Sequence, residues 1–129
     1  MAYTISRADG DNFTGTSFHD GYIKATYNQL VEAFGKPVYT DSTGYKVTCE
    51  WKLKIVVDGY AIPVMFTVYD WKEDVSPLKN RDNYYEFHIG THAPEGTKLV
   101  IKFLKDKFGD DMDVYCEDPY SRLQRMFGK

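Results

Sequence analysis

Two histidines in the second half of the chain have the spacing that comes closest to a metal site. His88 and His92 lie four positions apart, and Glu86 lies two positions before the first of them. On a helix such a pair shares one face, and zinc binding needs three or four ligands in fixed geometry. Gly90 and the surrounding alternation instead place His88 on a strand and His92 in the following turn. We therefore expect a hydrogen-bonded strand histidine, an exposed turn histidine, and no metal or other cofactor.

The sequence lacks the motifs of the common catalytic nucleophiles. It contains no Gly-x-Ser-x-Gly elbow and no glycine-rich phosphate loop between a strand and a helix. Cys49 lies on the apolar side of a predicted strand, where burial makes a thiol unreactive. The paired carboxylates, Asp110-Asp111 and Glu117-Asp118, are short runs typical of a solvated surface. We therefore predict no catalytic residues and no enzymatic activity.

Aromatic and charged residues gather after the second predicted strand and around the third. Tyr69-Asp70-Trp71-Lys72 ends the second strand, and a loop of about ten residues follows, a length that often carries function. The candidate binding residues are Tyr69, Asp70, Trp71, Lys72, Arg81, Tyr84, His88 and His92. Tyrosine and tryptophan supply large contact area at low entropic cost, which favours a surface that binds a protein partner.

Two other ligand classes fit parts of this region. A nucleotide could be surrounded by Trp71, Arg81, Tyr84 and His88. The bases of a single-stranded nucleic acid could stack on a basic and aromatic sheet face formed by Lys46, Lys52, Lys54, Tyr69 and Trp71. Glu50 lies among these lysines, and the formal net charge of -3 supplies no basic field for nucleic acid.

A long β-hairpin must position these residues. From Tyr45 to Val57 the odd positions are apolar and most even positions are polar, which indicates a strand with one buried face. Asp58-Gly59 is typical of a two-residue hairpin turn, and Tyr60–Tyr69 has the pattern of the return strand. This turn would place Ile55 opposite Ile62, Leu53 opposite Val64, and Trp51 opposite Phe66, with Trp51 and Phe66 in the core.

Apolar stripes with helical spacing predict two helices. The first stripe consists of Ile23, Tyr27, Leu30, Val31 and Phe34, and the second consists of Leu99, Val100, Phe103, Leu104 and Phe108. Thr26 and Gln29 match a capping box at the start of the first helix. Gly35 and Gly109 are placed to end the two helices in a left-handed conformation.

These elements predict an α+β fold. A third strand, in which Tyr85, Phe87 and Ile89 alternate with polar residues, is expected to pair antiparallel with the second. Residues 23–109 would then form an α-β-β-β-α core, an antiparallel sheet of three to four strands with two helices packed on one face. We expect residues 1–22 to form an N-terminal strand and loop. Residues 110–129 would form a C-terminal appendage, strand-like at 112–116 and helical at 119–127.

Length and composition predict a single soluble domain. A chain of 129 residues can bury a core without disulfide or metal staples. No stretch approaches the roughly 20 apolar residues of a membrane span, and the first residues lack a signal-peptide apolar region. We therefore expect a cytoplasmic protein with no membrane partner.

Several short runs resemble a family of small proteins encoded by tailed bacteriophages and prophages. The resemblance covers about residues 16–92 and lies in FGxP at Phe34–Pro37, EWxL at Glu50–Leu53, YDWK at Tyr69–Lys72 and HIG at His88–Gly90. Family members often carry tryptophan where this chain has Phe87. The resemblance carries over no catalytic residue.

The resemblance implies a phage accessory protein that acts in the cytoplasm of the bacterial host. Small phage domains of this kind bind and inhibit host defence factors, including CRISPR nucleases, or sequester nucleotide signals. The leading hypothesis is a non-enzymatic inhibitor that binds a host defence protein. The alternatives are a sponge for a nucleotide second messenger and a single-stranded nucleic-acid-binding protein. A homodimer remains open.

Overall fold

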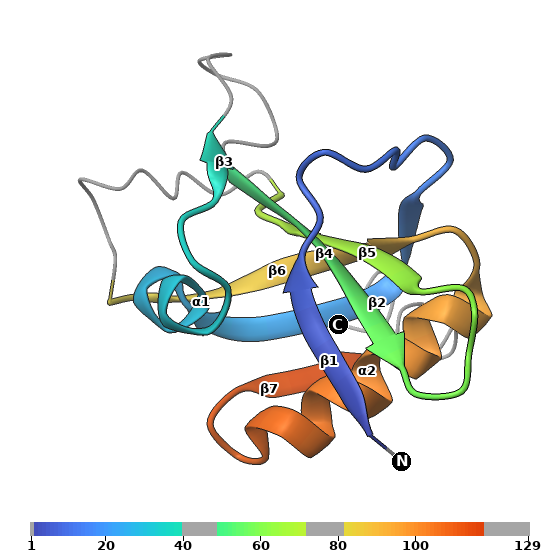
Figure 1. Ribbon diagram of the computed structural model, residues 1–129. Helices are drawn as coiled ribbons and strands as arrows, with labels where there is room; N and C mark the ends of the chain where they lie inside the picture. Colours follow the sequence, from blue (N-terminus) through green and yellow to red (C-terminus); the bar gives the residue numbers. More distant parts are fainter. Residues whose placement is uncertain (1, 40–48, 72–81, 118–129) are drawn as a thin grey trace.

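The computed structural model describes residues 2–39, 49–71 and 82–117. Over these residues the chain forms an α+β fold with an open antiparallel sheet and two helices, as predicted (Figure 1). Six strands lie side by side in the order β1 (Tyr3–Arg7), β4 (Cys49–Val57), β5 (Val64–Tyr69), β6 (Tyr84–Thr91), β2 (Ser17–Thr26) and β7 (Asp113–Cys116). The short β3 (Val38–Tyr39) pairs with the start of β4. The helices are α1 (Tyr27–Phe34) and α2 (Pro94–Phe108).

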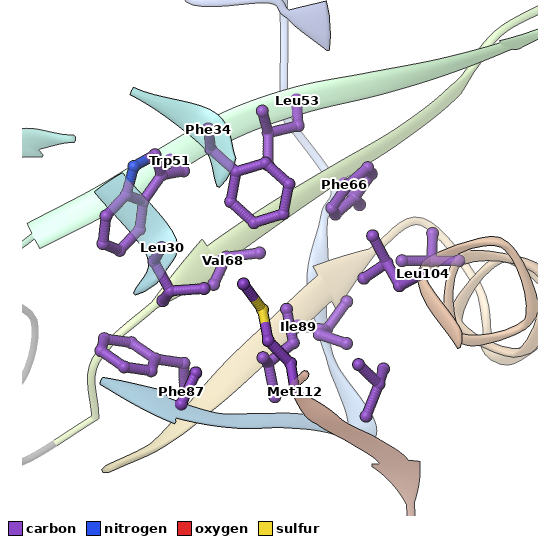
Figure 2. Packing of buried hydrophobic residues seen from close by; sticks show 14 of the residues in the cluster. Leu30, Phe34, Trp51, Leu53, Phe66, Val68, Phe87, Ile89, Leu104 and Met112 are labelled. Atoms are coloured by element: carbon purple, nitrogen blue, oxygen red, sulfur yellow. The ribbon is translucent and has the colours of Figure 1, made fainter. Parts of the chain in front are cut away.

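The core lies between one face of the sheet and both helices. The fully buried side chains that fill it include Leu30 of α1, Leu104 of α2, and Trp51, Leu53, Phe66, Val68, Phe87 and Ile89 of the sheet (Figure 2). The rings of Phe34 and Phe108 meet edge to face with centroids 5.7 Å apart, which joins α1 to the end of α2 over this face. The core positions of Trp51 and Phe66 are therefore as predicted.

Helix α1 has the predicted capping box at Thr26 and ends at the predicted Gly35. The Thr26 hydroxyl accepts a hydrogen bond from the Gln29 N–H at 3.0 Å, and the Gln29 side chain accepts one from the Thr26 N–H at 2.9 Å. These two bonds satisfy donors that a helix start leaves unpaired. At the other end Gly35 has a φ of 87°, and its N–H donates to the Val31 carbonyl.

The prediction for the first 26 residues was wrong in one respect. Residues 17–26 form the long strand β2, so Ile23 belongs to the sheet and not to the first helix. β2 lies between β6 and β7, and this pairing on both edges outweighs the helical spacing of Ile23. Because β1, β2 and β7 all join the sheet, it has more strands than the three to four predicted. Such pairings join segments far apart in the chain, so the local pattern of a strand does not identify its neighbours.

The hairpin of β4 and β5 has a register two residues away from the predicted one. Ile55 lies opposite Val64, Leu53 opposite Phe66, and Trp51 opposite Val68. The turn is longer than two residues, although Gly59 has the expected positive φ of 89°. A shift of two keeps every side chain on its face, so the apolar alternation cannot distinguish the two registers. Pro63, which has no N–H to donate, lies just outside β5.

The second half of the fold follows its pattern more closely. β6 pairs antiparallel with β5 as predicted, and β7 covers the strand-like stretch near the C-terminal end. Helix α2 ends at Gly109, whose φ is 56°. The buried stripe of α2 is rotated from the predicted one, because Leu99 is 44% exposed while Ile101 is buried. The predicted helix at 119–127 lies outside the described residues.

Candidate binding site

The second face of the sheet carries a group of aromatic rings around His88. The ring of His88 stacks on Phe18 with centroids 4.2 Å apart and on Trp71 with centroids 5.8 Å apart. Tyr22 and Tyr69 meet it edge-on, with centroid distances of 5.3 Å and 5.5 Å. We call these five residues the His88 cluster. It brings together three predicted binding residues, Tyr69, Trp71 and His88.

A β-bulge in β2 brings Phe18 to this cluster. Phe18 lies opposite Gly90 and Gly21 lies opposite Ile89, so residues 19–20 are extra on the β2 side. Asp20, in the bulge, has a φ of 64°, in the left-handed region that residues other than glycine rarely adopt. Because of the two extra residues, Phe18 lies two positions closer to His88 along β6 than it would in a regular strand. Bulges of this kind often re-aim side chains at functional sites.

These surroundings favour the neutral form of His88. Burial among the rings lowers the pKa of His88 below its usual 6.5, and the negative charge of Glu86 opposes this effect without reversing it. Glu86 itself accepts a hydrogen bond from the Tyr115 hydroxyl, and Tyr115 stacks on Tyr22 with centroids 5.2 Å apart. The pKa of Tyr115 is raised by burial and by this hydrogen bond.

The lowered pKa predicts how stability changes with pH. The unfolded chain binds a proton at His88 near pH 6.5, whereas the folded chain binds it only at lower pH. Protonation of His88 therefore favours the unfolded state, and the free energy of unfolding decreases as pH falls below 6.5. We expect the His88→Gln variant to lose less stability than the wild type between about pH 7 and pH 5.5. Urea denaturation at both pH values measures this difference. His92→Gln is the control and should follow the wild type; equal slopes for wild type and His88→Gln would contradict the prediction.

A pocket of about 260 Å³ opens beside the cluster. It is lined by Thr16, Ser17, Glu50, Thr67, Tyr69, Trp71 and Gly90. The loop between β1 and β2, which arches away from the tip of β1 in Figure 1, contributes the first of these residues. Residues of the same loop also contact two lysines of this face. Asp11 pairs with Lys54 at 3.7 Å, and the Lys52 ammonium lies 5.9 Å from the centre of the Phe13 ring.

Three predicted binding residues have other positions. Asp70 is fully buried, and its carboxylate accepts a hydrogen bond from the Cys49 N–H at 2.9 Å, so its role is structural. Tyr84 is 64% exposed at the start of β6, and no ring contact joins it to the cluster within the described residues. His92 lies in the turn before α2 and contacts the Thr14 carbonyl at 3.1 Å. Lys72 and Arg81, like Lys46 of the nucleic-acid hypothesis, lie outside the described residues.

Sequence reasoning missed four contributors to this site. Phe18 and Tyr22 were assigned to a loop and its junction with the first helix, but they belong to β2. Glu50 was noted only as a charge among lysines, although it lines the pocket. Tyr115 extends the ring contacts from β7. The alternation of Tyr22 and Lys24 with the buried Ile23 and Ala25 was the available signal for the strand.

Comparison with family models, curated proteins and solved structures finds no match. Within residues 2–39, 49–71 and 82–117, no group of three or more histidine, cysteine, aspartate or glutamate side chains is arranged to hold a metal ion. In the same part of the chain, no helix is both long and apolar enough to cross a lipid bilayer.

Proposed function

We propose that the protein is a non-enzymatic phage accessory protein that inhibits a host bacterial defence factor by binding it through the His88 cluster. The observation that carries this proposal is the gathering of five aromatic rings on the sheet face opposite the helices, with Trp71 38% exposed beside an open pocket. Partly exposed tryptophan and tyrosine rings next to a pocket are the usual centres of protein-binding surfaces. The phage resemblance supplies the biological setting.

The charges on this face favour a protein over a nucleotide or a nucleic acid. The pocket contains the carboxylate of Glu50, which would repel phosphate groups. Lys52 lies against Phe13 and Lys54 pairs with Asp11, so neither ammonium is presented alone to a phosphate backbone. The pocket volume of about 260 Å³ is also below the range of roughly 300–1,000 Å³ that holds complete small ligands. The pocket is better suited to a single side chain of a larger partner.

The proposal is tested by phage plating on bacterial strains that each carry one defined immune system, with CRISPR nucleases first. Expression of the chain should restore plating on the strain whose effector it binds. The purified chain should then form a stoichiometric complex with that effector and inhibit it. No restored plating on any strain of the panel would overturn the proposal.

A matched pair of aromatic variants tests the location of the surface. Trp71→Ala should abolish both the plating effect and the complex, because it removes the exposed ring of the cluster. Tyr60→Ala removes an aromatic side chain that is 65% exposed in the β4–β5 connection, and it should leave both unchanged. The reverse result would place the binding surface at the other end of the hairpin.

A further inference from the structure

The Glu50 carboxylate is the only acidic group among the described residues that line the pocket beside the His88 cluster. Glu50 on β4 lies opposite Tyr69 on β5, so its side chain and the Tyr69 ring leave the same face of the sheet as neighbours. Trp71 lies two residues further along this side of the hairpin and also lines the pocket. The walls of the pocket are therefore one carboxylate and two aromatic rings.

The floor of the pocket is formed where β5 and β6 pair. Gly90 lies opposite Thr67, and a Cβ atom at Gly90 would lie 2.6 Å from the Thr67 Oγ1 and 3.4 Å from Tyr69 Cε1. Any larger residue would push the Tyr69 ring or the Thr67 side chain out of place. Glycine thus lets the ring lie close to the neighbouring strand and keeps the pocket open. Thr16 and Ser17 complete the lining of the pocket.

Within residues 2–39, 49–71 and 82–117, the cation that acts on Glu50 is Lys52, without a direct ion pair. Among the residues that the structure describes, no hydrogen bond or ion pair reaches its carboxylate, and it is half-buried. Burial raises the pKa of Glu50, and the nearby charge of Lys52 only partly opposes this shift. Burial and the charge of Glu50 also raise the pKa of Tyr69 to about 12. Burial makes a carboxylate costly to keep ionised, and an approaching cation offsets that cost, so the half-buried Glu50 in a pocket points to a cationic ligand.

We infer that this pocket binds the guanidinium group of an arginine side chain presented by the protein partner. A planar guanidinium can stack on the Tyr69 and Trp71 rings while its N–H groups donate to the Glu50 carboxylate. The hydroxyls of the threonine and serine residues that line the pocket can accept its remaining hydrogen bonds. Lysine would also carry a positive charge, but it has neither a planar surface for stacking nor the geometry for a bidentate hydrogen bond to the carboxylate. This inference rests on the proposed function, since it names the group that the partner would insert.

Short peptides test the chemistry without knowledge of the partner. The probe is an acetylated and amidated Gly-Ser-Arg-Ser-Gly peptide, and matched peptides carry lysine or citrulline in place of arginine. Citrulline has the shape of arginine but no charge. The binding of each peptide is followed by NMR through the indole N–H signal of Trp71, assigned with the Trp71→Phe variant. The arginine peptide should shift this signal saturably, and the citrulline peptide should bind about tenfold or more weakly.

Two variants separate the carboxylate from the fold. Glu50→Gln should weaken binding of the arginine peptide about tenfold or more, whereas Glu95→Gln, an exposed acid in the first turn of α2, should not change it. Because the folded chain disfavours the ionised form of Glu50, the glutamine variant should also be more stable than the wild type near neutral pH and lose that advantage below about pH 4.5. A structural carboxylate would give the opposite change in stability.

Each result supports or overturns the inference. No saturable shift with the arginine peptide, equal binding of the citrulline peptide, or unchanged affinity in Glu50→Gln would overturn it, and equal binding of the lysine peptide would replace guanidinium recognition by general cation binding. The plating assay is independent of these measurements. A plating effect that survives in Glu50→Gln would sink the arginine pocket and leave the proposed function standing. Binding of the arginine peptide without any plating effect would support the arginine pocket and overturn the proposed function.

Discussion

The Trp51→Ala variant is expected to lose about 3–5 kcal/mol of unfolding free energy. Trp51 has no exposed surface, and its ring packs between Tyr27 of α1 and Phe87 of β6, with centroid distances of 6.1 Å and 5.9 Å. Its indole N–H also donates to the Gly35 carbonyl at 2.7 Å, which fixes the end of α1 to the sheet. Alanine would leave a large cavity and an unpaired carbonyl. Urea denaturation followed by circular dichroism measures the loss.

The second tryptophan of the chain provides the matched control for this prediction. Trp71→Ala removes the same side chain from a position that is 38% exposed, and it should change stability by less than about 1 kcal/mol. If Trp51→Ala does not fold, Trp51→Phe keeps most of the ring and should still be less stable than the wild type. A loss below about 1 kcal/mol for Trp51→Ala would mean that the faces of the hairpin are assigned the wrong way round.

The Asp70→Ala variant is expected to lose about 1.5–3 kcal/mol, the usual range for a hydrogen bond to a charged group. Asp70 follows β5 directly and is fully buried, and its carboxylate accepts the hydrogen bond of the Cys49 N–H. A second hydrogen bond joins the same two residues, because the backbone N–H of Asp70 donates to the Cys49 carbonyl at 3.4 Å. Asp70 therefore joins the end of β5 to the start of β4. Alanine would leave a buried N–H without its acceptor.

An exposed aspartate of the same hairpin is the control for Asp70. Asp58→Ala, in the β4–β5 connection, should change stability by no more than about 0.5 kcal/mol. Asp70→Asn keeps an oxygen acceptor and should lie between the wild type and Asp70→Ala. If Asp70→Ala were as stable as the wild type but no longer formed the complex with the host effector, Asp70 would belong to the binding surface, as the sequence predicts.

The sequence predicts the local parts of this fold well. The capping box at Thr26, the helix ends at Gly35 and Gly109, and the buried faces of β4 and β6 all depend on residues close together in the chain. The order of the sheet, with β2 between β6 and β7, depends on pairings between distant segments, and the register of the β4–β5 hairpin depends on the length of its turn. Alternation fixes only the face of each strand, so a register shift of two and the true neighbour of β2 were invisible to it.

In the candidate site, too, the residues marked by local sequence were found and those positioned by strand pairing were missed. Tyr69, Trp71 and His88 were found because aromatic and titratable side chains stand out near a strand end. Phe18 joins them only through the bulge in β2, a feature without a sequence signal of its own. Asp70 was placed among the binding residues because a charged residue beside exposed rings usually faces solvent, but its side chain turns inward to the backbone of β4.

The strand order has a consequence for the time at which the site forms. β4 and β5 are joined by a short connection and can pair within about 1–10 μs, as hairpins do. β2 must instead wait for β6, because residues 17–26 pair with residues 84–91. Pairing over such a separation slows folding, and during synthesis it cannot begin until β6 has left the ribosome. Since the rings around His88 come from β2, from β5 and the residues just after it, and from β6, the chain becomes competent to bind only after β2 has paired with β6.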